Sequence, residues 1–186
     1  MKEFDFRINT QLLSKFVGQE FVKYKCDEFI FTNSVSQFVE LYIGDKVFSL
    51  ENIQEPNDYF GYYTDVAIFK LVEKNSQIEQ FEHEDQVNTC INKKIINIKI
   101  INENQKMYVK QKIAYNVWFT RAIILELENS EEICFEKDSL FFSEEIVINR
   151  GHNLVNVLEK PDQFMETMRE EQDTEGEYYR EEININ

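Results

Sequence analysis

The sequence predicts a mainly β protein with a minor α part, in which two antiparallel β-meander units form a sandwich or two fused small barrels. Short apolar runs rich in Phe, Tyr, Ile and Val recur along the 186 residues, separated by short polar segments. Aromatic and β-branched side chains favour strands because they cover a pleated, half-buried surface well. The dipeptide Gly44-Asp45 lies between two such runs and is typical of a two-residue hairpin turn, because Gly tolerates positive φ.

Composition divides the chain into four segments. Pro161 suits the first turn of a helix, and the residues beyond Arg169 are too polar to bury, so a C-terminal helix with a mobile acidic tail is expected. Aligning the two halves at an offset of 86 matches their apolar positions, as expected either of a divergent duplication or of two unrelated meanders. The expected segments are 1–72 as the first β unit, 73–90 as an acidic linker, 91–160 as the second β unit, and 161–186 as the C-terminal helix and tail.

In the first unit, a short helix is expected from Thr10 to Val17, with Thr10 as its N-cap and Gly18 as a left-handed residue just past its end. The clearest hairpin covers Phe38–Leu50. Side-chain alternation along its first strand places three residues on the core face, namely Val39, Leu41 and Ile43. A loop is expected at 52–57.

In the second unit, strands at 95–101 and 107–113 are expected to be joined by a polar turn at 102–105. The stretch from Val117 to Gly151 follows and is expected at the centre of the antiparallel sheet. It holds the most continuous β-forming run and the only tryptophan, Trp118.

Charge is the most distinctive feature of the composition. A formal net charge of −15 disfavours direct binding of nucleic acid or anionic lipid and favours a basic protein partner, although acidity also serves solubility alone. The tail 161–186 has a net charge of −7, whereas Ile91–Lys112 has a net charge of +5. Either the tail folds back on this lysine-rich hairpin and shields it, or the lysines protect an exposed edge strand from aggregation.

The sequence shows no sign of catalytic, cofactor or metal chemistry. It contains no HExxH, CxxC, GxSxG, P-loop or GxGxxG motif, and the acidic residues around His83 cannot converge on a metal from a strand or helix. No apolar run is long enough to span a membrane, and the amino terminus lacks the apolar core of a secretory signal. Cys26, Cys90 and Cys134 are expected to be small buried hydrophobes, which favours a reducing, cytoplasmic location.

Three features supply the candidate contact residues: an aromatic run, two acidic hairpins and a single arginine. The run DYFGYY is expected either to form an exposed aromatic loop or to close one end of a barrel. The two acidic hairpins present carboxylates, and Arg121 lies within an apolar strand, where it is expected to pair with Glu126, Asp138 or Glu144. The predicted binding residues are Tyr59, Phe60, Tyr62, Tyr63, Asp45, Glu131, Glu132 and Arg121.

The leading hypothesis is a non-enzymatic, acidic protein-interaction module, such as a phage or bacterial inhibitor or immunity protein that acts on a basic, nucleic-acid-handling partner. One alternative is a small hydrolase or nuclease-like enzyme that uses Arg121, Asp138, Glu144 and His152 in a cleft. Another is a housekeeping domain that binds a small molecule. A pocket that gathers these four side chains would favour the enzyme, whereas a flat acidic face with protruding tyrosines would favour the binding module.

Overall fold

The computed structural model describes residues 3–28, 33–59, 62–74, 86–137, 143–158, 160 and 174–186. Most of these residues lie in antiparallel β-strands, as predicted, and one short α-helix lies near the N-terminus. In chain order the elements are β1 (Phe4–Phe6), α1 (Thr10–Leu13), the 3-10 helix η1 (Ser14–Phe16), β2 (Glu20–Asp27), β3 (Ser34–Ser36), β4 (Phe38–Ile43), β5 (Lys46–Tyr59), β6 (Tyr62–Glu73), β7 (Gln86–Val109), β8 (Lys112–Leu127), β9 (Glu132–Lys137), β10 (Glu145–Gly151), the 3-10 helix η2 (Leu154–Asn156) and β11 (Thr174–Ile185).

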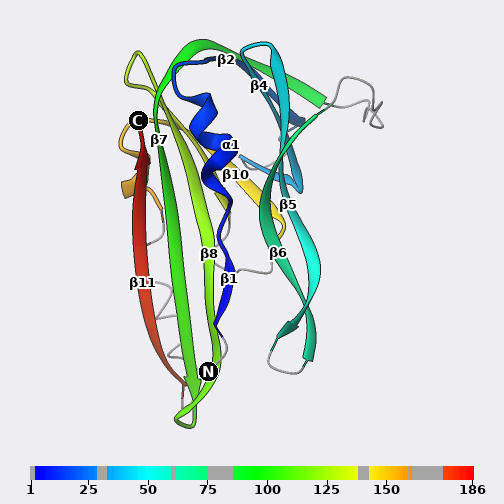
Figure 1. Cartoon of the computed structure of the whole chain (residues 1–186), viewed down its shortest axis with the longest axis vertical. Coiled ribbons are helices and arrows are strands. Elements are labelled where there is room, and N and C mark those ends of the chain that lie inside the picture. The colour runs from blue at the N-terminus through cyan, green and yellow to red at the C-terminus, as the bar shows by residue number, and fades with distance from the viewer. Residues whose placement is uncertain are drawn as a thin grey trace.

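Strand β7 connects the two parts of the sheet. Its first part pairs with β2, and its second part pairs with β8 on one edge and β11 on the other. The strands follow the order β3-β10-β9-β8-β7-β2-β4-β5-β6, with β1 added in parallel to β8. In Figure 1, β7 runs along most of the molecule and arches over its top, and β11 lies beside it. The described strands form no closed barrel, so the predicted fused barrels are not found.

The main hydrophobic core lies between the two curved parts of the sheet. The hairpin predicted at Phe38–Leu50 is confirmed, and its expected core residues Val39, Leu41 and Ile43 are buried. The short helical segment covers one end of this core and contributes Leu13 and Phe16, whose ring lies 4.7 Å from that of Phe48. The core therefore combines strand side chains from both halves with an apolar helical cap.

The N-terminal helix is shorter than predicted. Its N-cap is Asn9 rather than Thr10, because the Asn9 side chain accepts a hydrogen bond from the Gln11 amide at 2.9 Å. The helix then tightens into η1, and Gly18 follows with a φ of 82°. Gly18 thus has the left-handed conformation expected after a helix end.

The predicted polar turn at 102–105 is wrong. Strand β7 continues through it, and the turn to β8 is made by Lys110 and Gln111, whose φ values of 49° and 64° suit a tight hairpin. Asn102 and Glu103 are buried there and bonded to side chains of β8 and β11. The composition of this segment resembles that of a loop, but its buried side chains bond to side chains of the neighbouring strands.

The loop predicted at 52–57 is also wrong, because β5 runs through it without interruption. Asn52 is fully buried, and its side-chain amide donates to the carbonyl oxygens of Ser143 at 2.9 Å and Glu145 at 3.0 Å. Partners far away in the sequence allow this polar residue to lie within a strand.

The prediction for the C-terminal segment needs the largest correction. No C-terminal helix appears in the described part of the chain, and most of the predicted helix lies at 161–173, outside the described residues. Residues Thr174–Ile185 form β11 rather than a mobile tail, pairing with β7 from Val109 to Ile98. Ile183 and Ile185 pack against the main core. Thr174–Ile185 therefore folds back on the lysine-rich strand β7, while the shielding of the lysines by the tail stays a prediction.

Two further expectations can be compared with the described residues. Residues 86–90, expected in a linker, form the start of β7. Cys26 and Cys134 are buried as expected, but Cys90 is exposed on β7. None of the helices in the described ranges has the length and hydrophobicity needed to cross a membrane.

Candidate functional site

The described residues of the aromatic run DYFGYY lie at the end of the β5–β6 hairpin, at the lower end of Figure 1. Tyr59 pairs with Tyr62 and Tyr63 pairs with Asp58, whereas Phe60 lies outside the described residues. The run therefore occupies a hairpin end, far along β5 from the turn that carries Asp45.

The two acidic hairpin turns lie on either side of β7. The Gly44 amide, next to Asp45, donates to the Glu20 carbonyl at 2.8 Å, and Glu20 pairs with Lys94 on β7. The Glu128 amide in the β8–β9 turn donates to the Lys94 carbonyl at 2.9 Å. The structure thus brings the two turns to one end of the molecule, but it places lysine between them.

The carboxylates of Glu131 and Glu132 already have internal partners. Glu131 accepts from Arg150 at 2.7 Å, which lowers the pKa of Glu131. Glu132 is buried and accepts from the Lys99 ammonium at 2.5 Å and from the Leu154 amide at 2.6 Å. Burial opposes ionisation of Glu132, but these donors outweigh it, so its pKa lies below the ordinary value. Glu132 holds η2 against the sheet.

Arg121 is buried and paired, as predicted, but its partners are Glu136 and Glu103 rather than Glu126 or Glu144, while Asp138 lies outside the described residues. Its Nη2 lies 2.7 Å from Glu136 and its Nε lies 3.6 Å from Glu103. Glu103 is fully buried and also accepts two hydrogen bonds from Arg180 of β11, at 2.5 and 2.9 Å. Burial raises the pKa of Glu136, while Arg121 opposes this shift. We call Glu103, Arg121, Glu136 and Arg180 the buried charge cluster.

The residues of the enzyme alternative have separate partners. Glu144 accepts from the Gln54 amide at 2.8 Å and from the Gln37 side chain at 3.1 Å, whereas His152 Nδ1 lies 2.7 Å from the Ser130 carbonyl. Asp138 is outside the described residues. Burial raises the pKa of the Cys134 thiol, and the described residues contain no cluster of metal-ligating side chains.

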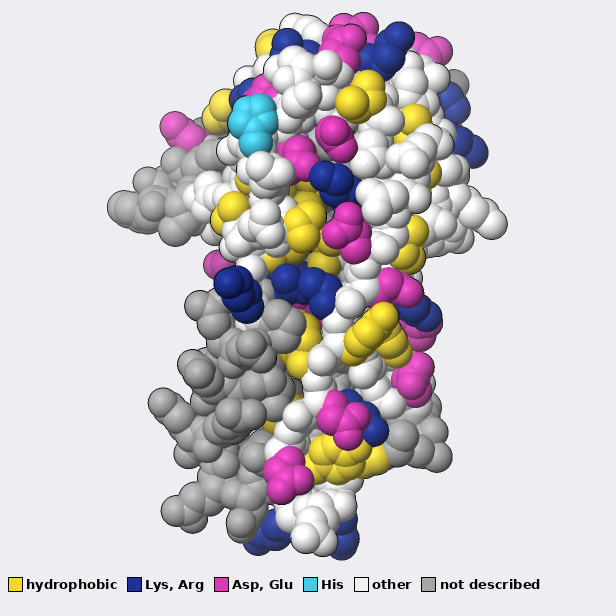
Figure 2. Space-filling model, turned by 90° about the vertical axis from the view of Figure 1, so that its left-hand side faces the viewer, with side chains coloured by type: hydrophobic (Ala, Val, Ile, Leu, Met, Phe, Trp, Pro, Cys, Tyr) yellow, Lys and Arg dark blue, Asp and Glu magenta, His cyan; other side chains and the backbone are white. Residues whose placement is uncertain are grey.

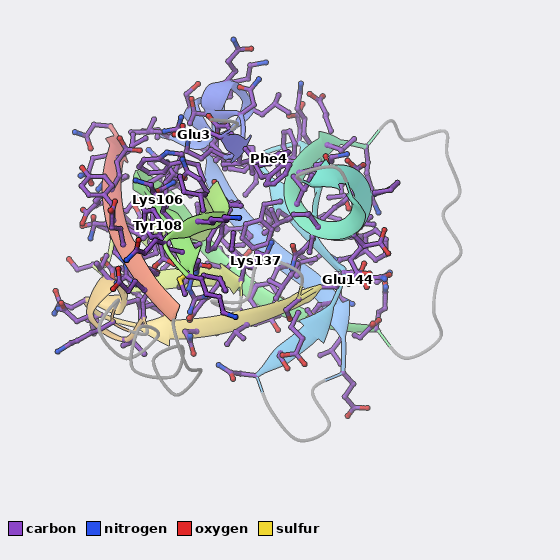
Figure 3. All side chains as sticks on the ribbon, turned by 90° about the horizontal axis from the view of Figure 1, so that it is seen from below. Glu3, Phe4, Lys106, Tyr108, Lys137 and Glu144 are labelled. Atoms are coloured by element: carbon purple, nitrogen blue, oxygen red, sulfur yellow. The ribbon has the colours of Figure 1, made fainter. Side chains whose placement is uncertain are left out.

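Lys137 is the most deeply buried lysine among the described residues. Figure 3 places it in the interior, and its ammonium donates to the Ala67 carbonyl of β6 and lies 5.5 Å from the centre of the Phe119 ring. These contacts join β9 and β8 to the β5–β6 hairpin. The position of Lys137 therefore has a structural explanation.

A surface outside the predicted set of binding residues lies where β1, β8, β7 and β11 run side by side. The Arg7 guanidinium lies 4.8 Å from the centre of the Trp118 ring. The ring of Tyr179 meets Trp118 edge-on, with the ring centres 5.6 Å apart and the planes at 75°. Tyr179 is 58% exposed and Trp118 is partly exposed. An aromatic pair with an arginine over it is therefore presented to solvent.

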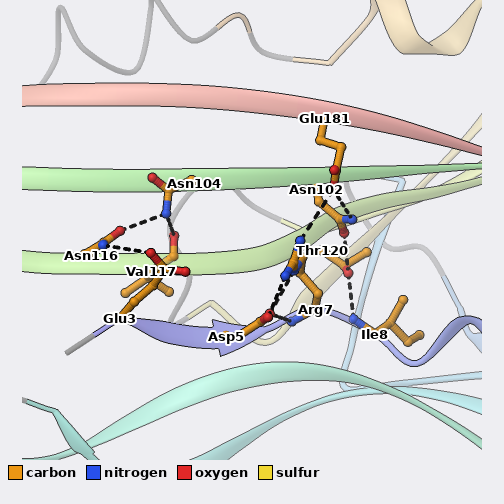
Figure 4. Close-up of polar contacts among 10 residues, drawn as sticks. All are labelled: Glu3, Asp5, Arg7, Ile8, Asn102, Asn104, Asn116, Val117, Thr120 and Glu181. Carbon is orange, nitrogen blue, oxygen red and sulfur yellow. Dashed lines mark hydrogen bonds and ion pairs between the residues drawn. The ribbon is translucent and has the colours of Figure 1, made fainter. Parts of the chain in front are cut away.

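Polar side chains around this aromatic pair link the four strands (Figure 4). The Asn102 side chain donates to Glu181 of β11 at 3.2 Å and accepts from Thr120 of β8 at 2.9 Å. Thr120 in turn accepts from the Ile8 amide, just after β1, at 2.8 Å. These bonds fix the relative positions of the strands, so the exposed rings lie on a rigid base.

A second chain of bonds links β7 and β8 to Glu3, just before β1. The Asn104 side chain donates to Asn116 at 2.8 Å, and Asn116 donates to Glu3 at 3.2 Å. We call the whole surface the Trp118 face, and it consists of Glu3, Asp5, Arg7, Asn102, Asn104, Trp118, Tyr179 and Glu181.

The sequence contained one indication of this face. Val117 and Phe119 are buried, so alternation along β8 places Trp118 on the opposite side of the strand. The positions of Arg7 and Tyr179 could not be inferred in this way, because they come from opposite ends of the chain and reach Trp118 through β1 and β11.

The chain matches no protein-family model, and searches of curated proteins and of solved structures gave no significant match.

Proposed function

We propose that this protein is a non-enzymatic module that binds a basic protein partner through the Trp118 face. The observation that carries the proposal is the exposed group of Arg7, Trp118 and Tyr179. Tryptophan, tyrosine and arginine are the residue types that most often dominate the free energy of protein–protein binding. Rigid rings cover much area at little entropic cost, and here they stand on a hydrogen-bonded sheet.

Charge supports a basic partner. The acidic residues Glu3, Asp5 and Glu181 on the Trp118 face outnumber its single basic residue, Arg7, and the whole chain carries −15. Beside the face, Glu177 is already paired with Lys106. Figure 2, which views the side that carries β11, shows acidic, basic and hydrophobic side chains interspersed rather than gathered in blocks of one sign. Recognition would therefore combine aromatic contact with a moderate negative charge, as in an inhibitor that covers a basic surface.

The test is a capture experiment from the native host with three baits. The wild-type protein and a Phe38→Ala control, which removes a side chain that is 42% exposed on β4, should retain the same basic protein. The Trp118→Ala, Tyr179→Ala double variant should retain at least about tenfold less, since hot-spot truncation costs about 2 kcal/mol or more. Binding should weaken at high salt, because screening reduces the contribution of charge.

Folding of each bait is checked first by urea unfolding. If the folded double variant retains the same proteins as the wild type, the Trp118 face is not the contact surface. If the wild type retains no partner in low salt, the proposed function is wrong.

A further inference from the structure

The Trp118 face contains a corner with the chemistry of a guanidinium-binding site. Two aromatic rings at 75° form its walls, Trp118 from β8 and Tyr179 from β11. Carboxylates flank it, because Asp5 pairs with Trp118 across the sheet and Glu181 is two residues from Tyr179 on the same side of β11. Electron-rich ring faces attract cations, and paired carboxylate oxygens match the planar donors of arginine.

Arg7 already lies on the Trp118 side of this corner, between Asp5 and Glu181. Its Nε and Nη2 donate to the two carboxylate oxygens of Asp5, at 2.9 and 2.6 Å, while its Nη1 lies 3.6 Å from Glu181. The same guanidinium lies 4.8 Å from the centre of the Trp118 ring. The chain's own arginine therefore shows which ligand the corner accepts and in what orientation.

The way Arg7 is held allows it to leave. Arg7 lies just after β1, outside the regular strand. The side chains of Arg7 and Glu181 are each 35% exposed and that of Asp5 is 49% exposed, so water screens all these interactions. Ion pairs of this kind contribute little to folding stability and exchange readily for equivalent external pairs.

We infer that Trp118, Tyr179, Asp5 and Glu181 form a binding site for an arginine side chain of a partner protein, and that Arg7 blocks this site until the partner's arginine displaces it. This inference rests on the proposed function, because it names the chemistry of the same surface. Arginine fits better than lysine, since the bidentate contact with Asp5 and the stacking on Trp118 both use a planar group. The carboxylates would repel an anionic ligand.

Trp118 is the only tryptophan, so its fluorescence reports on the corner directly. The probe is N-acetyl-arginine amide, titrated into the wild-type protein, into Arg7→Ala, and into an Arg150→Ala control that removes an exposed arginine paired with Glu131 elsewhere on the surface. The fluorescence of Arg7→Ala should change saturably, with a midpoint probe concentration at least about tenfold lower than that of the wild type. The reason is that Arg7 in the wild type is a tethered competitor with a high effective concentration. Arg150→Ala should behave like the wild type.

Two controls test the chemistry of binding. N-acetyl-citrulline amide, which keeps the shape but lacks the charge, should not saturate Arg7→Ala. Adding Asp5→Asn and Glu181→Gln to Arg7→Ala should raise the midpoint for the arginine probe at least about tenfold. Equal midpoints for the wild type and Arg7→Ala, or equal responses to arginine and citrulline, would overturn the inference.

The outcomes separate this inference from the proposed function. If the arginine probe does not bind while capture of a protein still depends on Trp118 and Tyr179, the Trp118 face is the contact surface but the inferred guanidinium site is wrong. If the probe binds as expected while no protein is captured, the guanidinium site stands without the proposed partner.

Discussion

The two faces of the β11–β7–β8 part of the sheet use the same residue types for different purposes. On one face, Glu103 and Arg180 are bonded to each other within the buried charge cluster. On the other, Arg7 is paired with Asp5 and Glu181 on the Trp118 face. Neighbouring strand residues point to opposite sides, so one step along β11, from Arg180 to Glu181, separates a buried salt bridge from a solvent-accessible surface.

This comparison shows that burial decides what an arginine–glutamate pair does. Breaking a buried pair leaves an uncompensated charge in a medium of low polarity, whereas an exposed pair is screened and contributes little. The buried cluster should therefore hold β11 in place, and the exposed group should be free to exchange partners. Three stability measurements test this division, in addition to the two binding experiments above.

The largest effect is expected for Glu103→Ala. This change leaves Arg121 and Arg180 without their shared carboxylate in a buried position, which should reduce the free energy of unfolding by about 3–5 kcal/mol. The measurement is the midpoint of urea unfolding, compared at an unchanged slope of free energy against urea concentration. Glu131→Ala is the control, because its pair with the exposed Arg150 should contribute about 0–1 kcal/mol. A loss below about 1 kcal/mol for Glu103→Ala would remove the distinction between the two faces.

An intermediate and pH-dependent effect is expected for Glu132→Gln. At pH 7 the loss of charge-assisted hydrogen bonds from Lys99 and Leu154 should lower stability by about 1–3 kcal/mol. The pKa of Glu132 is lowered in the folded state, so this stabilisation is complete above its ordinary value of 4.5 and is lost as pH falls through the folded-state pKa.

The difference between wild type and Glu132→Gln should therefore be constant from pH 7 to about pH 5.5 and should shrink at more acidic pH. Chemical unfolding at a series of pH values measures it. A difference that grows on acidification would mean that Glu132 is protonated in the folded protein and that Lys99 does not stabilise its charge.

The smallest effect is expected for Arg7→Ala, which should change stability by about 0–1 kcal/mol because Arg7 and Asp5 are solvent-screened. Thermal unfolding at low and high salt checks this value and should show little dependence on salt. A loss above about 2 kcal/mol would mean that Arg7 is part of the folded framework, and displacement by a partner's arginine would then be too costly.

Local patterns predicted a large part of the fold. The hairpin around Gly44-Asp45, the buried face of Val39, Leu41 and Ile43, and the left-handed Gly18 were all inferred correctly. Each depends on residues close together in sequence, namely the period of two along a strand or the backbone freedom of glycine. The mainly β class follows from the same patterns.

Three errors concern polar segments. The regions 52–57, 102–105 and 174–185 have the composition of loops or tails, yet each lies in a strand. The side-chain NH2 group of Asn52 donates to the carbonyl oxygens of Ser143 and Glu145, which lie far along the chain. A sequence pattern shows that a side chain is polar but not that a distant partner will meet it.

By itself, the sequence determined the strand-rich class, the main apolar core face and the negative charge, because these depend on local periodicity and composition. Only the tertiary structure decided that the acidic C-terminal segment pairs with β7, and that Arg7 and Tyr179 meet at Trp118. The physical reason is that burying a polar or charged group costs free energy unless a partner lies close enough to compensate it. In this protein, such partners come from strands far apart in the chain.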